Sequence, residues 1–107
     1  MTFADELQRK VQEVWLRHLP LMRSRLEVVG RAIEALRRGE LTPELSIDAA
    51  QGAHKLAGSL GTFGLQTGSD AAVEIEKLFS GDVPLHAADA SRAHQHLAEL
   101  RRAIERK

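Results

Sequence analysis

The sequence predicts an all-α fold: an antiparallel four-helix bundle with an additional N-terminal helix. Apolar residues recur every three or four positions along the 107-residue chain, which is the period of an amphipathic helix. No segment of useful length alternates apolar and polar residues, so no β-strand is predicted. Glycine and proline mark short connections, which favour antiparallel neighbours. A chain of this length is expected to form one domain, over residues 1–107.

Two helices are expected before residue 40. The first is expected to pack across or along one end of the bundle through an apolar stripe made of Phe3, Leu7, Val11, Val14 and Trp15. Pro20 is expected to break or restart the chain, because proline cannot donate a helical hydrogen bond. The second helix begins near Leu19 and stops at Gly39, directly after the basic pair Arg37 and Arg38.

Three further helices complete the predicted bundle. Thr42 followed by Pro43 is typical of an N-cap and a first helical residue, so a third helix begins there. Its apolar stripe continues to a glycine-rich stretch, and the helix is expected to end within residues 61–64. A fourth helix follows and stops near Gly81. The last helix starts near residue 85 or 88 and ends in basic residues, as the helix dipole favours.

Composition excludes several classes of function. The chain has 15 basic and 15 acidic residues, and this zero net charge argues against a nucleic acid or a polybasic membrane surface as partner. It has no cysteine, which excludes disulfides, cysteine zinc sites and thiol catalysis. Its apolar runs are too short for a membrane span, and its start lacks the pattern of a signal peptide. We therefore expect a cytoplasmic protein or domain, and a monomer.

His54 has an unusual place on the third helix. At about 100° per residue it lies roughly 120° or more from every residue of the apolar stripe, so it is expected to point outward. The positions around it hold mostly small or apolar residues instead of the usual charged ones: Ile47, Ala50, Gln51, Ala57, Gly58 and Gly61. Glycine weakens a helix, so we interpret these positions as a docking face that lets another protein approach the imidazole.

The chemistry of an exposed histidine suits phosphoryl transfer. A neutral imidazole, common near pH 7, has a nitrogen lone pair that can attack phosphorus. No pair among His86, His94 and His96 has the i, i+4 spacing of a helical metal site, so no metal centre is predicted. The chain is therefore expected to be a phosphocarrier and not a self-sufficient enzyme. The alternative is a non-catalytic helical interaction module that uses the same face without phosphorylation.

A run of residues around His54 resembles a known signature. The segment from Ala53 to Leu65 reads AHKLAGSLGTFGL, which is similar to the signature of histidine-containing phosphotransfer (HPt) domains, the phosphorelay modules of two-component signalling. The positions that match the family pattern are His54, Leu56, Gly58, Ser59 and Gly64. Glu76, in the following helix, resembles a recurrent acidic position of the family.

This resemblance implies a specific role for His54. In the family, the histidine is phosphorylated on a ring nitrogen by a receiver-domain aspartyl phosphate or by a histidine kinase, and it passes the group to another response-regulator receiver domain. The receiver brings its own Mg²⁺, so no cofactor is expected on this chain.

One position departs from the family pattern. Many members have lysine three residues after the histidine, where this chain has Ala57. Lys55 and Gln51 are the candidates here for contact with the phosphate or the imidazole. Ser59 is expected to serve packing or backbone bonding, and His18 to be a surface or capping residue.

Overall fold

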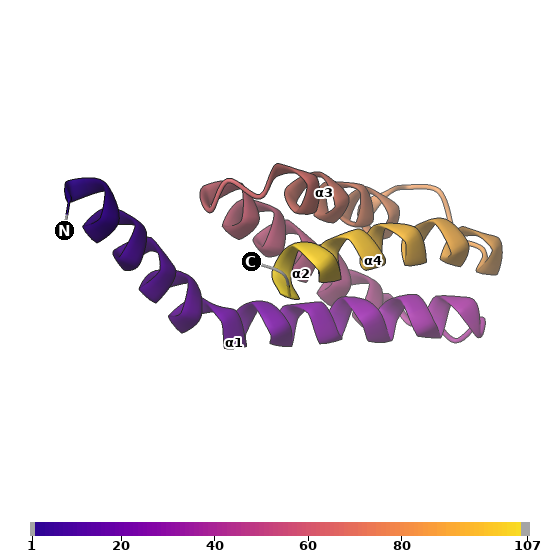
Figure 1. The fold of residues 1–107 in the computed structure, drawn as a ribbon. Coiled ribbons are helices and arrows are strands. Elements are labelled where there is room, and N and C mark those ends of the chain that lie inside the picture. The colour runs from indigo at the N-terminus through magenta and orange to yellow at the C-terminus, as the bar shows by residue number, and fades with distance from the viewer. Residues whose placement is uncertain (1, 106–107) are drawn as a thin grey trace.

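Four α-helices form an antiparallel bundle in the computed structural model, which describes residues 2–105. They are α1 (Phe3–Arg37), α2 (Pro43–Thr62), α3 (Gln66–Ser80) and α4 (Ala90–Glu105), with a short 3-10 helix, η1 (Ala87–Asp89), before α4. Successive helices run in opposite directions (Figure 1), and each packs against two others in the ring α1–α2–α3–α4. The all-α bundle expected from the hydrophobic period is therefore observed.

The core lies along the axis of this ring. All four helices contribute an apolar face to it, as expected when amphipathic helices bury their stripes against one another. Its largest fully buried side chains are those of Trp15, Met22, Ile33, Leu56, Leu60, Ile75, Leu97, Leu100, Ile104 and Val29. Leu56 and Leu60 come from the same helix as His54, so the core holds that helix firmly.

The separate leading helix expected from the sequence is not observed. Residues 3–37 form one continuous helix of 35 residues, α1, with Pro20 inside it. A proline removes one backbone hydrogen bond and its ring crowds the preceding turn, which bends a helix but need not end it. Figure 1 shows α1 changing direction within its N-terminal half, and we attribute this bend to Pro20. The two helices predicted before residue 40 are therefore the two parts of α1.

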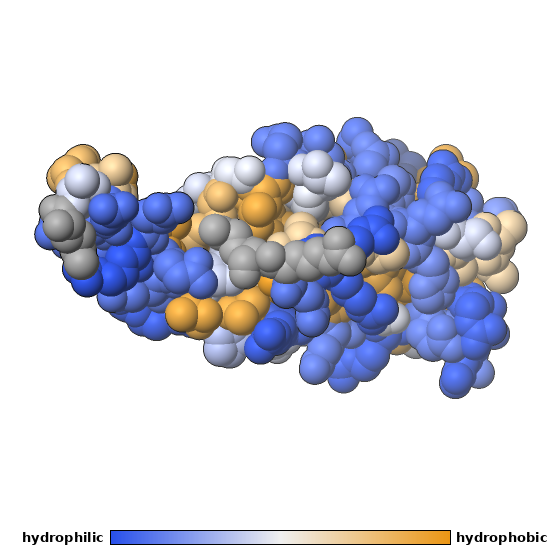
Figure 2. All heavy atoms as spheres, viewed as in Figure 1, coloured by the Kyte–Doolittle hydropathy of each residue, from blue (hydrophilic) through white to orange (hydrophobic). Residues whose placement is uncertain are grey.

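The N-terminal part of α1 projects beyond the bundle as an arm, residues 3–14 (Figure 1). The expectation that its apolar stripe packs on the bundle is wrong, because Phe3, Leu7, Val11 and Val14 are 40–81% exposed. The physical reason is length, since α1 has 35 residues and the helices beside it only 15–20. Figure 2 shows part of this apolar surface as orange atoms at the upper end of the arm, whose other visible atoms are mostly hydrophilic. Within residues 2–105, no helix is both long and apolar enough to cross a membrane.

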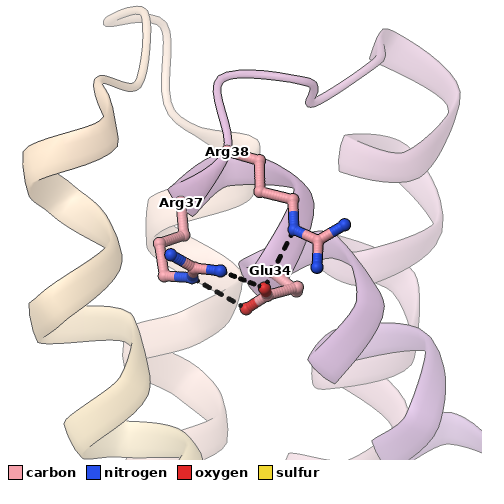
Figure 3. Close-up of polar contacts among 3 residues, drawn as sticks. All are labelled: Glu34, Arg37 and Arg38. Atoms are coloured by element: carbon pink, nitrogen blue, oxygen red, sulfur yellow. Dashed lines mark hydrogen bonds and ion pairs between the residues drawn. The ribbon is translucent and has the colours of Figure 1, made fainter.

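An ion-pair cluster closes the other end of α1. Glu34 accepts hydrogen bonds from Nε, at 3.0 Å, and Nη2 of Arg37 and from Nε of Arg38 at 3.1 Å (Figure 3). The hydrogen bond from Arg37 lowers the pKa of Glu34 from 4.5 to about 2, and the positive charges of Arg37 and Arg38 add to this effect. The two arginines also suit the negative end of the helix dipole.

This cluster predicts a pH dependence of stability. Because the pKa of Glu34 is lower in the folded chain, its ion pairs stabilise the fold above pH 4.5 and lose that effect as the pH falls toward about 2. Thermal unfolding of Glu34→Gln should therefore show a lower melting temperature than the parent at pH 6, with the gap closing by pH 2. Glu40→Gln, which alters an exposed carboxylate just after the helix, is the control. A gap that stays constant over this range would contradict the assignment.

Candidate functional site

His54 stands on the outer face of α2, near the middle of the helix. Its side chain is 73% exposed, while Ala53 and Leu56 beside it in sequence are fully buried. This agrees with the outward orientation that the helical period predicts. The imidazole therefore sits on a rigid, core-anchored helix and is open to a partner from outside.

The ring of His54 is held by a carboxylate from the next helix. Its Nδ1 lies 3.1 Å from Oε2 and 3.2 Å from Oε1 of Glu76, a residue of α3 whose side chain is 31% exposed. An ionised carboxylate can only accept hydrogen bonds, so this contact requires the proton of the neutral ring to be on Nδ1. Nε2 then carries the free lone pair. Glu76 thus orients the ring and selects the tautomer with the proton on Nδ1.

Two open grooves flank His54. The groove between α2 and α3, called here the α2–α3 groove, is lined by Ala50, Gln51, His54, Lys55 and Glu76. The groove between α1 and α2, called here the α1–α2 groove, is lined by Val14, His18, Arg25, His54, Lys55, Gly58, Ser59, Thr62 and Phe63. His54 and Lys55 line both, so the imidazole lies on the ridge that separates a carboxylate-bearing groove from a basic one.

The two candidates for the phosphate or imidazole environment both lie at this ridge. Lys55 is exposed and lines both grooves, and Gln51 is exposed and lines the α2–α3 groove one turn before His54. Neither side chain makes a hydrogen bond to His54 within the described part of the chain. The residue that does contact the ring, Glu76, was expected only as a family position, because periodicity along one helix does not show which residue of another helix faces it.

The predicted docking positions are only partly exposed. Ile47 is 57% exposed, and Gly58 and Gly61 also face solvent. Ala50 and Ala57 are half-buried and pack against the core, so their expected place on a fully outward face is wrong. The cause is α3, which lies along that flank of α2. The hydroxyl of Ser69 on α3, for example, donates a 2.8 Å hydrogen bond to the carbonyl oxygen of Ala57.

Two glycines of the signature have different structural reasons. A Cβ added at Gly58 would meet no atom within 4 Å, so this position keeps open space beside His54. Gly64 has a φ of +76°, a left-handed conformation that favours glycine. It ends α2 by allowing the backbone N–H of Leu65 to reach the carbonyl of Leu60 at 2.8 Å. The helix therefore ends at Thr62, within the predicted range.

One wall of the α1–α2 groove is a contact that the sequence did not predict. His18 Nε2 and Ser59 Oγ lie 3.0 Å apart, so Ser59 bonds a side chain of α1 and His18 is neither a plain surface residue nor a cap. Next to them, Trp15 and Phe63 pack edge to face with ring centroids 5.0 Å apart. His18 lies beside α2 because α1 continues through Pro20. A prediction that breaks the chain at this proline does not place His18 on the helix that packs against α2.

Residues 2–105 contain no cluster of side chains that could bind a metal ion. Nowhere in this range do three or more His, Asp or Glu side chains group in a way that could hold a metal ion. His94 and His96 lie on α4, far in sequence from His54, and His86 precedes η1. The chemistry available at the ridge is therefore that of one imidazole, one carboxylate and the nearby basic side chains.

Comparisons with known proteins agree with this geometry. The family model of the Hpt domain matches residues 3–106, nearly the whole chain. Protein RcaC of Microchaete diplosiphon is 32% identical over 71 residues, which cover 66% of this chain and 11% of RcaC, so the chain spans a small part of that relative's length. No solved structure gives a significant match. With an exposed histidine on a helical bundle and a family match along its length, the chain belongs to the Hpt domain family, the phosphotransfer modules of two-component signalling.

Proposed function

We propose that His54 accepts a phosphoryl group from a receiver-domain aspartate or a histidine kinase and passes it to another receiver domain. The observation that carries this proposal is the contact between Nδ1 of His54 and Glu76, at 3.1 Å, on a side chain that is 73% exposed. It leaves Nε2 as a nucleophile that a partner protein can reach. The chain is then a carrier, and its partner supplies the rest of the reaction centre.

The transfer step follows from the tautomer. Nε2 of the neutral imidazole attacks the phosphorus of an aspartyl phosphate, the N–P bond forms, and the P–O bond to the aspartyl carboxylate breaks with its electron pair. The product ring is an imidazolium that keeps its proton on Nδ1, and the charge of Glu76 stabilises it there. No proton has to move during the step. The reverse sequence returns the group to a second receiver aspartate.

Docking is proposed over the surface around the ridge. Ile47, Gly58 and Gly61 are exposed and offer apolar or small residues for contact. The half-buried Ala50 and Ala57 project little from the flank of α2. Gln51 and Lys55 are then the long side chains of α2 that a partner meets beside His54. The Mg²⁺ that offsets phosphate charge during transfer is proposed to be on the receiver.

The proposal is tested by mapping the phosphorylated residue. The chain is incubated with candidate receiver domains already phosphorylated on aspartate, and the modified peptide is identified by mass spectrometry under neutral conditions that preserve N–P bonds. Acid-labile phosphate on the peptide that contains His54 is the expected result. Stable binding to a receiver without any label would contradict transfer and favour the alternative of a non-catalytic interaction module.

Gly58→Leu is expected to slow transfer from a receiver domain by about tenfold or more, because a bulky side chain on the docking surface keeps the receiver from bringing its phosphoryl group within reach of the imidazole. An added Cβ meets nothing within 4 Å, so the fold should stay intact by circular dichroism. Gly58→Ala is the matched control and should transfer at nearly the parental rate. Phosphorylation by the small donor phosphoramidate should change little in either variant. Equal receiver rates for Gly58→Leu and the parent would refute the access argument.

A further inference from the structure

We propose that Arg25, on α1, binds the phosphoryl group carried by His54. This inference rests on the proposed function and names the cation that would neutralise the phosphorylated site. Arg25 is half-buried and lines the α1–α2 groove together with His54 and Lys55. It lies 29 positions before His54 in the sequence, and only the packing of α1 on α2 brings both to one groove.

Close packing of α1 on α2 places Arg25 beside the ridge. A Cβ added at Gly52 would lie 3.5 Å from the carbonyl oxygen of Arg25 and 4.0 Å from its Cβ. The backbones of the two helices therefore approach closely two residues before His54. The side chain of Arg25 starts at this crossing. An arginine side chain is long, so its guanidinium can extend along the groove toward a phosphoryl group on the imidazole.

The α1–α2 groove has the charge that a phosphoryl group needs. Its lining residues include Arg25, Lys55 and the two histidines, His18 and His54, and they include no carboxylate. Arg25 makes no ion pair or side-chain hydrogen bond with any residue in the described range 2–105. Asp48 lines the adjoining groove with Arg25, but the two side chains are not paired at 4.0 Å or less. By contrast, Arg37 and Arg92 each form an ion pair with a carboxylate of their own helix or the turn before it.

The opposite side of His54 repels a phosphoryl group. Glu76 lies in the α2–α3 groove, and its negative charge disfavours phosphate oxygens there. The phosphoryl group on Nε2 is therefore directed to the α1–α2 groove, away from the carboxylate at Nδ1. Lys55 is the sole lysine or arginine of α2, so a second full positive charge has to come from another helix. A guanidinium can donate two parallel hydrogen bonds to phosphate oxygens, which makes Arg25 suited to this role.

The test uses Arg25→Gln, with Arg23→Gln as the matched control and Arg25→Lys as the conservative variant. Arg23 is exposed on the same helix and lines neither groove, so its loss makes the same change in net charge. The probe is phosphoramidate, whose P–N bond breaks as ammonia leaves and the bond to Nε2 forms. Phosphorus NMR follows the rate of labelling and then the decay of phosphohistidine after the donor is removed. Circular dichroism checks that each variant is folded.

We expect Arg25→Gln to label about tenfold more slowly than Arg23→Gln, with Arg25→Lys in between, because a lysine keeps the charge and loses the paired hydrogen bonds. The difference should shrink at high salt. Equal labelling and decay for Arg25→Gln and Arg23→Gln, with the parent labelled on His54, would overturn the role of Arg25 and leave the proposed function standing. No label on His54 of the parent from phosphoramidate or from any phosphorylated receiver would refute the proposed function and this inference with it.

Discussion

His54→Gln is expected to abolish phosphorylation of the chain while leaving the bundle folded. The side chain is 73% exposed and contributes nothing to the core, so its replacement removes little packing. Glutamine keeps the length and the hydrogen-bonding capacity, but its amide nitrogen has no free lone pair to attack phosphorus. The measurement is transfer from a phosphorylated receiver domain, followed by gel retardation of the phosphoprotein and by mass spectrometry.

Two further variants make this result specific. His94→Gln removes an exposed histidine on α4 and should keep the full label, which separates loss of the acceptor from loss of any histidine. Glu76→Gln keeps the nucleophile and removes the charge that stabilises the imidazolium, so it should keep the label at a rate about tenfold lower. Full labelling of His54→Gln would show that another residue is the acceptor. Unchanged kinetics in Glu76→Gln would show that the carboxylate has no part in the step.

Trp15→Ala is expected to cost about 3–5 kcal/mol in the free energy of unfolding, the range for removing a large aromatic side chain from a core. Trp15 is 1% exposed and packs edge to face on Phe63, with ring planes at 89°. It is the point where the described part of α1 enters the core, since the arm before it is exposed. Urea unfolding monitored by circular dichroism measures the loss, which is a large share of the stability of a small domain.

Leu16→Ala is the control for this substitution. Leu16 is the next residue on the same helix and is 56% exposed, so its truncation should change the free energy of unfolding by less than about 1 kcal/mol. Comparable losses in the two variants would mean that the buried contact of Trp15 stabilises the bundle no more than an exposed side chain does. A folded Trp15→Ala should also transfer phosphate more slowly, because Phe63, its partner, lines the α1–α2 groove.

Local sequence patterns were sufficient to predict the helix ends that are marked by a capping residue or a glycine. Thr42 accepts a hydrogen bond from the backbone N–H of Leu45 at 3.1 Å, as its N-cap position predicts. Gly64 ends the helix that carries His54. The boundary predicted at Pro20 is wrong. A proline lacks the N–H that continues a helix, but α1 packs against α2 and α4 and stays helical through this residue. Propensity is a weak signal where tertiary packing opposes it.

The amino-acid sequence by itself determined the all-α class, the bounds of α2 and the outward direction of His54. These depend on the period of one helix and on residues close in the chain, so the sequence contains all the information they need. Only the tertiary structure decided that Glu76 holds Nδ1 of His54, that Ser59 meets His18, and that Arg25 shares the groove with the imidazole. Those pairs depend on how each helix is rotated and shifted against its neighbours. That relation is set by the fit of many buried side chains across the core, and no local pattern records it.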